Sequence, residues 1–185
     1  MEHLSREAFL AAFLAEWDAR LQADPVKLHE AYANNRAWTD YVLSYKGFLN
    51  AVGERLKETL PDITYSKEIY SIDAMYVGGE NLFRSNMCYP SKIYALIEHE
   101  NAFNLEEEMW KLIFWRSHLK VLICYDYNDY DKTSTAKSKW LERKIRKLLS
   151  MQKKVRGYIP EPQGVEYLFL RACRKEPRGT IFWKW

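Results

Sequence analysis

KIYALIEHENAFNLEEEMWKL, residues 92–112, has two acidic residues at the end of an apolar segment. Its β-branched and aromatic first part predicts a strand over residues 92–100, and its second part has the spacing of a helix that begins near Asn104. Alternate residues of a strand share a face, so Glu98 and Glu100 are expected to point to the same side. Carboxylates are rare in a buried strand, and this pair is therefore a candidate functional site.

The neighbouring segments predict an α/β fold. ITYSKEIYSIDAMYV, residues 63–77, predicts one long strand or two short ones that stop at a Gly-Gly turn. Asn104 with Glu107 is typical of a capping box at the start of the next helix. HLKVLICYD, residues 118–126, is nearly all apolar and predicts a centrally buried strand. This order predicts a central mixed β-sheet flanked by helices.

Extra elements are expected on both sides of this core. Ser5 caps a predicted first helix, and Asp24 with Pro25 begins a short second one. One longer helix is expected through residues 38–56, ended by Pro61. After the core we expect a helix over residues 134–153 and a C-terminal β-hairpin, residues 165–173 and 180–185. All of this is assigned to one domain, residues 1–185, made of an N-terminal helical segment (1–36), a core (37–127) and a basic helix with the final strands (128–185).

The composition is that of an ordinary globular protein, with 48% hydrophobic and 29% charged residues and a net charge of +3. Cysteines are few and scattered, so neither a zinc site nor a disulfide framework is expected, and a cytoplasmic location follows as the default. No apolar run approaches the ~18 residues of a membrane span, so no membrane partner is expected. Gly-rich phosphate loops and acyl-transfer motifs are also missing.

Asp73 lies in the strand region that precedes Glu98. If the two strands pair, Asp73 can lie beside Glu98 and Glu100 at one edge of the sheet. Three like charges placed there repel one another unless a cation lies among them. All-oxygen ligands favour Mg²⁺ or Mn²⁺ over zinc. The alternative is that the two glutamates end a strand in a solvated loop and that Asp73 lies on an exposed face.

Residues 38–127 resemble the PD-(D/E)XK nuclease superfamily, which has a restriction-endonuclease-like fold. The resemblance lies in the order of the elements: a helix, a strand bearing Asp73, a strand bearing Glu98, a helix and a strand. Asp73 matches the family's Asp and Glu98 its Glu, while Glu100 occupies the position of its Lys. The resemblance implies Mg²⁺- or Mn²⁺-dependent hydrolysis of phosphodiesters by a DNA endonuclease, with Asp73 and Glu98 as metal ligands.

The missing lysine leaves two alternatives open. Glu100 is a further ligand or the general base, or Lys111 projects its ammonium back from the following helix. The family often carries another acid on the preceding helix, and Glu54 is the preferred candidate for a further ligand. Glu58, and Glu68 on the first strand, are the other candidates.

A basic helix is the second candidate for function. In KSKWLERKIRKLLSMQKKVR, residues 137–156, Glu142 is the only acid. The cations fall largely opposite the apolar residues, which predicts a surface that contacts the phosphates of a nucleic acid, DNA rather than RNA. The affinity of such a surface for nucleic acid falls as the salt concentration rises. A solvated helix face is the alternative. The cations are Lys139, Arg143, Arg146, Lys147 and Lys153.

The leading interpretation is therefore a metal-dependent endonuclease, and a homodimer is compatible with this function. The alternatives are a non-catalytic nucleic-acid- or partner-binding protein on the same fold, and a module that dimerises through its aromatic C-terminus. His99 is expected on the opposite face of its strand, packed rather than catalytic. Residues 126–131 are expected to form a polar turn rather than a calcium site, because they lack the Gly and Glu of an EF-hand loop.

Overall fold

A computed structural model of the chain describes residues 3–82, 89–101, 104–125, 134–158, 160–174 and 181–185. Its strands form one six-stranded sheet in chain order. The first three strands are antiparallel neighbours, the third to fifth are parallel, and the sixth is antiparallel to the fifth. The strands are β1 (Thr64–Ile69), β2 (Ile72–Asn81), β3 (Pro90–Asn101), β4 (Leu119–Tyr125), β5 (Glu166–Arg174) and β6 (Ile181–Lys184).

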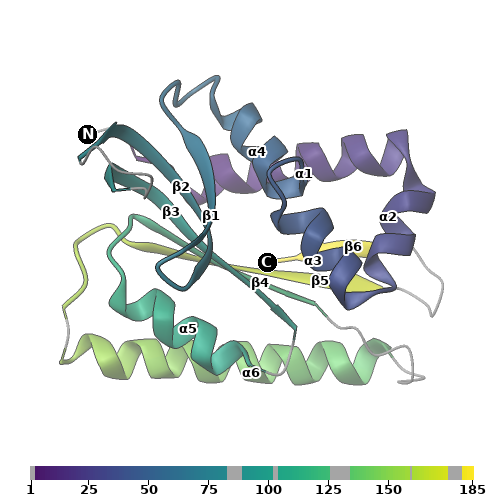
Figure 1. Ribbon diagram of the computed structural model, residues 1–185. Helices are drawn as coiled ribbons and strands as arrows, with labels where there is room; N and C mark the ends of the chain where they lie inside the picture. The colour runs from purple at the N-terminus through teal and green to yellow at the C-terminus, as the bar shows by residue number, and fades with distance from the viewer. Residues whose placement is uncertain (1–2, 83–88, 102–103, 126–133, 159, 175–180) are drawn as a thin grey trace.

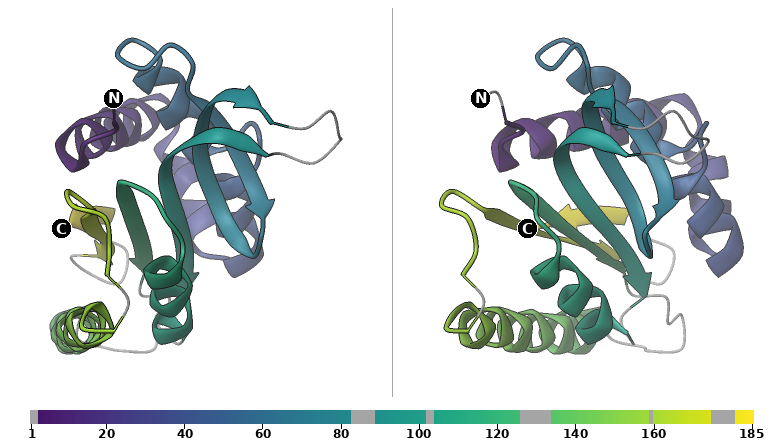
Figure 2. Two further views of the ribbon diagram at one scale, coloured as in Figure 1. Left: turned by 90° about the vertical axis from the view of Figure 1, so that its left-hand side faces the viewer. Right: turned by 60° about the vertical axis from the view of Figure 1, so that its left-hand side comes forward.

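Helices cover both faces of this sheet, which confirms the predicted α/β class with a mixed sheet (Figure 1). One face carries α1 (Arg6–Ala23), α2 (Pro25–Tyr32), α3 (Asn35–Leu43) and α4 (Phe48–Leu56). The other carries α5 (Leu105–Phe114) and α6 (Ser134–Arg156), as the turned views show (Figure 2). Each face has its own apolar core, because alternate strand residues point to opposite sides. No helix in the described part of the chain is both long and apolar enough to cross a membrane.

The caps of the first two helices are as predicted. The Ser5 side chain accepts a hydrogen bond from the Ala8 N–H at 3.1 Å, and α1 begins at the next residue. The Asp24 side chain accepts one from the Lys27 N–H at 2.9 Å, with Pro25 as the first residue of α2. These signals are local, so they can be recognised without the fold.

The single helix expected through residues 38–56 is wrong. The chain breaks between α3 and α4, and Gly47 is the N-cap of α4. A Cβ on Gly47 would lie 2.7 Å from the Ser44 carbonyl oxygen, so this turn requires glycine. The break lets α4 turn and pack on the sheet, where the Tyr76 hydroxyl donates to the Leu49 carbonyl at 2.6 Å.

The segment 63–77 forms two strands, which was one of the two predicted alternatives. Tyr70 and Ser71 link them with positive φ angles of 54° and 61°. β2 then continues through Gly78 and Gly79 to Asn81, so the expected stop at the Gly-Gly pair is wrong. The pair lies instead where the register between β2 and β3 shifts.

The elements that follow match their predictions in kind. All seven residues of β4 are buried, and β5 and β6 pair antiparallel as the predicted hairpin strands. Asn104 occupies the N-cap of α5, but its side chain makes no capping hydrogen bond, so the predicted capping box is wrong. The polar turn expected at residues 126–131 lies outside the described residues.

Candidate metal centre

The pairing of β2 with β3 puts Asp73 beside Glu98. Ala74 is the register partner of Ile97 and the strands are antiparallel, so Asp73, one residue before Ala74, lies opposite Glu98, one residue after Ile97. The Asp73 N–H donates to Glu98 Oε2 at 3.3 Å, and the His99 N–H donates to Asp73 Oδ2 at 2.8 Å. Glu98 is 0% exposed. The alternative of a solvated strand end is therefore wrong for Glu98.

Helix α5 adds an acid and a base to this pair. Glu108 and Lys111 are three residues apart, so both side chains leave the same side of the helix. One carboxylate oxygen from each of Asp73, Glu98 and Glu108 lies within 4.8 Å of the other two. Lys111 Nζ lies 3.0 Å from Glu98 Oε1 and also forms an ion pair with Glu108. This set of four residues is called the carboxylate cluster below.

Lys111 also fixes the β1–β2 turn over the cluster. Its ammonium donates to the Ser71 carbonyl at 3.0 Å. Ser71 is one of the turn residues in the left-handed region, a backbone conformation that a non-glycine residue keeps only when neighbouring contacts hold it. The turn, β3 and α5 thus meet at a single side chain.

Burial controls the charge of the cluster. Burial, together with the charges of Asp73 and Glu108, raises the pKa of Glu98 to about 9, although Lys111 opposes this. Burial also raises the pKa of Asp73, against the hydrogen bond from the His99 N–H. Burial works against the charged form of Lys111, but its bonds to Glu108 and Glu98 prevail and raise its pKa. One ammonium thus faces three carboxylates that cannot all be charged without a further cation.

Two buried oxygens of the cluster lack regular hydrogen bonds. Within the described residues, Glu98 Oε1 and Glu108 Oε2 have no partner of hydrogen-bond geometry, although the Lys111 ammonium is close to both. Both oxygens therefore have the Lys111 ammonium as their counter-ion in this structure. Carboxylate oxygens alone are a donor set that fits Mg²⁺ or Mn²⁺.

The other predicted acids lie elsewhere. Glu100 is half-buried on the same face as Glu98, one strand repeat further on, and is not among the three grouped carboxylates. The predicted preference for Glu54 as a further ligand is wrong, because α4 packs on the opposite face of the sheet. Lys57 Nζ instead donates to both Glu54 carboxylate oxygens. Glu58 and Glu68 are exposed.

Glu108 is the residue that the sequence reasoning missed. It stands in an acidic run at the first turn of α5, where acids are common because they favour the positive end of the helix dipole. Its spacing of three from Lys111 was a usable signal, since it places both side chains over β3 once the helix packs there.

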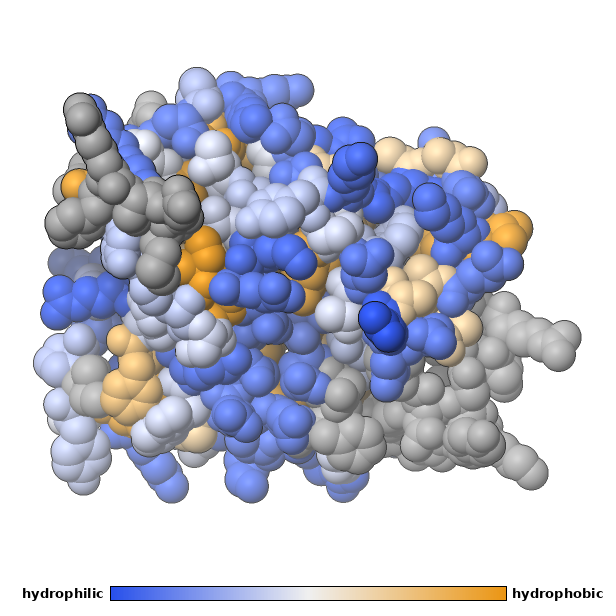
Figure 3. Space-filling model, viewed as in Figure 1, coloured by the Kyte–Doolittle hydropathy of each residue, from blue (hydrophilic) through white to orange (hydrophobic). Residues whose placement is uncertain are grey.

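The predicted basic face is exposed on α6. Leu141 and Leu148 are buried beneath it, and Lys144 pairs with Glu106 of α5 at 2.9 Å between Nζ and Oε2. Figure 3 shows mainly hydrophilic side chains along the edge of the molecule where α6 lies. The five predicted residues, Lys139, Arg143, Arg146, Lys147 and Lys153, are all exposed.

Two further expectations concern aromatic surroundings. His99 is buried on the opposite face between the rings of Trp38 and Tyr125, as predicted, and burial lowers its pKa to about 3. Trp183 is a core residue whose ring contacts Phe13 edge-on, so this part of the aromatic C-terminus does not form an outer surface.

No family model, curated protein or solved structure matches this chain. Its function is therefore inferred from the carboxylate cluster, the basic helix and the arrangement of the elements that carry them.

Proposed function

We propose that this protein is a metal-dependent nuclease with a restriction-endonuclease-like fold, and that it acts on DNA as an endonuclease. The observation that carries the proposal is the carboxylate cluster, in which half-buried Asp73 of β2 meets the buried acids Glu98 of β3 and Glu108 of α5, and one ammonium pairs with the latter two. Apart from the additional strand β1, the order α4, β2, β3, α5, β4 is also the order that the resemblance implies.

Asp73, Glu98 and Glu108 would hold Mg²⁺ or Mn²⁺. The fit rests on their all-oxygen donor set and on the grouping of three carboxylates around a single ammonium. When bound, such an ion lowers the pKa of a coordinated water and neutralises charge on the phosphate. Glu108 takes the place that sequence reasoning gave to Glu54.

Lys111 would act on the phosphate. Its raised pKa keeps it charged at neutral pH, so it stabilises negative charge on the phosphate rather than removing a proton. Glu100, half-buried on the same strand face, remains the candidate general base for the attacking water. In-line attack of the water oxygen on phosphorus, with cleavage of the P–O3′ bond, leaves a 3′-hydroxyl and a 5′-phosphate.

The test is cleavage of supercoiled plasmid, single-stranded DNA and RNA with Mg²⁺ or Mn²⁺. Asp73→Asn and Glu98→Gln are compared with wild type, and Glu54→Gln is the matched control because it removes an exposed acid on the other face of the sheet. We expect metal-dependent cleavage by wild type and the control, and loss of at least a hundredfold in both cluster variants. Equal cleavage by all four proteins would reject the site.

A non-catalytic nucleic-acid-binding protein is the second candidate. It is favoured by the double pairing of Lys111, which neutralises part of the cluster without any metal. In this case no substrate is cut, while salt-sensitive DNA binding persists equally in wild type and Asp73→Asn.

A further inference from the structure

Two large aromatic side chains lie exposed on the outer side of α5. Trp110 is 48% exposed and Phe114 is 45% exposed. Their ring centroids are 4.8 Å apart, with the planes inclined by 56°. Most aromatic residues of this fold are packed in its cores, as Trp38 and Phe13 are. This pair, called the aromatic ridge below, is accessible to a partner outside the chain.

The ridge lies between the carboxylate cluster and the basic helix. At roughly 100° per residue, Trp110 and Phe114 fall between Glu106 and Lys111 on the solvent side of α5. Lys111 points to Glu98 on one side of the helix, and Glu106 pairs with Lys144 of α6 on the other. A chain that runs from α6 to the cluster over the solvent side of α5 therefore crosses the ridge.

Charge decides which part of a nucleic acid contacts α5. The first turn of the helix carries Glu106, Glu107 and Glu108, which repel phosphates. On α6, Lys147 is close enough to Glu106 to help Lys144 lower the pKa of that carboxyl against the effect of burial. Phosphates are thus favoured over α6, and uncharged base faces are favoured over α5.

We propose that the aromatic ridge stacks unpaired bases, and that the substrate enters the carboxylate cluster as a single strand. This inference rests on the proposed nuclease function and names its substrate class. Bases in a duplex have both faces covered by their neighbours, whereas unpaired bases expose π-faces to aromatic side chains. Phe114 and Trp110 at helical spacing offer two such surfaces on one side of α5.

The test is binding, measured by fluorescence anisotropy in EDTA, of a labelled 12-nucleotide oligo-dT and of a duplex of the same length. The Trp110→Ala/Phe114→Ala double variant is compared with wild type. Tyr45→Ala is the matched control, because Tyr45 is 57% exposed and its ring packs on Tyr65 beside the core of the opposite sheet face.

We expect the double variant to lose roughly ten- to hundredfold in affinity for oligo-dT, the effect of removing one or two stacked bases. Its duplex affinity should change less than twofold, and its salt dependence should stay that of wild type because the cations of α6 still bind the phosphates. Trp110→Phe should retain most of the single-strand binding. Tyr45→Ala should behave as wild type for both ligands.

Unchanged oligo-dT affinity in the double variant, or an equal loss for duplex, would overturn the proposal. So would a failure of wild type to bind oligo-dT at low salt, or a wild-type dimer that the double variant breaks in analytical ultracentrifugation. Because the assay contains no metal and scores no cleavage, it separates the two proposals. If the double variant loses oligo-dT binding but the wild type cleaves no substrate in the cleavage assay, the nuclease proposal is wrong and the ridge proposal stands. If the wild type cleaves DNA but the double variant binds oligo-dT as tightly as the wild type does, the ridge proposal is wrong and the nuclease proposal stands.

Discussion

At the scale of single residues, Glu98 is an acid whose position costs stability. Because the pKa of Glu98 is raised from 4.5 to about 9, the folded protein keeps, between these two pH values, a proton that the unfolded chain has already lost. The folded state binds more protons across this window, so its stability falls as pH rises through it. A bound cation removes this cost by replacing the proton.

Glu98→Gln should therefore stabilise the protein when a chelator is present. At pH 8 we expect a higher Tm than wild type, by about 2–4 °C for each kcal/mol gained, and a difference that shrinks toward pH 5. Mg²⁺ or Mn²⁺ should raise the Tm of wild type and not that of the variant. Differential scanning fluorimetry measures both effects. A lower Tm for Glu98→Gln at every pH, with Glu54→Gln unchanged, would contradict the assigned protonation.

Lys111 should matter for rate more than for metal binding. Lys111→Met is expected to lower kcat by about 10²–10³, the range for removing one group that stabilises transition-state charge. The metal concentration for half-maximal thermal stabilisation should not rise, because a competing cation has been removed. Lys57→Met is the matched control, since Lys57 pairs with the exposed Glu54. A large rise in the metal requirement would assign Lys111 a role in building the metal site instead.

At the scale of elements, α5 and α6 divide the proposed work. α5 supplies Glu108 and Lys111 to the cluster and the aromatic ridge to solvent, while α6 supplies the exposed cations. The Glu106–Lys144 ion pair joins the two helices at their N-terminal halves. The residues proposed for binding and those proposed for chemistry thus lie on adjacent helices of one sheet face.

Removing two cations from α6 should weaken DNA binding through its salt dependence. For Arg143→Gln/Lys147→Gln we expect the slope of log K against log salt to become shallower by about 2 for duplex DNA, because each phosphate that is no longer neutralised reduces it by roughly 0.9. Filter binding at salt concentrations from about 50 to 200 mM measures this slope. Lys27→Gln on α2, exposed and distant from α6, is the control. An unchanged slope would show that the α6 face is only solvated.

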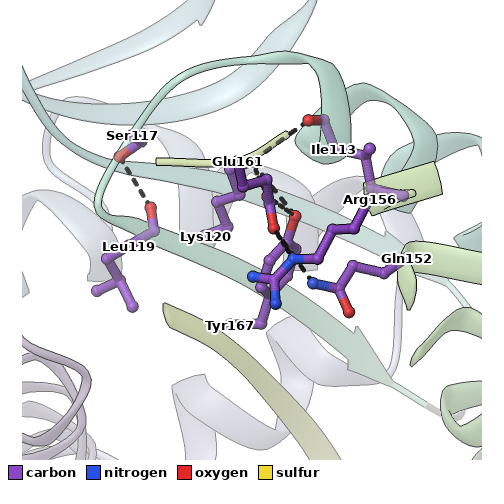
Figure 4. A network of polar contacts seen from close by, with 8 residues as sticks. All are labelled: Ile113, Ser117, Leu119, Lys120, Gln152, Arg156, Glu161 and Tyr167. Atoms are coloured by element: carbon purple, nitrogen blue, oxygen red, sulfur yellow. Dashed lines mark hydrogen bonds and ion pairs between the residues drawn. The ribbon is translucent and has the colours of Figure 1, made fainter. Parts of the chain in front are cut away.

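At the scale of the whole molecule, a second buried polar network holds the fold together on the side of α5 and α6. Lys120 on β4 is 1% exposed, and its ammonium donates to Glu161 Oε1 at 2.6 Å. Glu161 also accepts from Tyr167 and Arg156, so β4, β5, α6 and the segment before β5 meet at one carboxylate (Figure 4). These contacts lower the pKa of Glu161 to about 2, although burial opposes them.

Lys120→Met should destabilise the protein by about 3–5 kcal/mol, because it removes the buried cation of Glu161 and leaves this carboxylate paired, among the described residues, only with the more exposed Arg156. The double variant Lys120→Met/Glu161→Gln should recover part of this stability, since no buried charge then remains unpaired. Urea unfolding at pH 7 measures both. The folded pKa of Glu161 is depressed, so its contribution is present above about pH 4.5 and disappears as pH falls toward 2. Equal stability of Lys120→Met and wild type would refute this role.

Local signals in the sequence were enough for most elements and for three of the four residues of the carboxylate cluster. Period-two alternation identified Glu98 as facing one side of β3 and His99 as facing the other, and capping side chains marked the starts of α1 and α2. Asp73 was assigned to the site on the assumption that its strand pairs with β3, which the structure shows. All of these depend on residues within a few positions of one another or on adjacent strands.

Packing between distant segments supplied the rest. Whether an acid in the first turn of α5 faces solvent or the sheet depends on how the helix docks on β3, so Glu108 was not identified from its neighbours in sequence. Glu54 lies on the preceding helix, where the resemblance implies a further acid, but α4 packs on the far face of the sheet after the break at Gly47. Alternation and capping are short-range physical effects that can be read along the chain, whereas the meeting of the three carboxylates depends on which faces the helices cover in the folded protein.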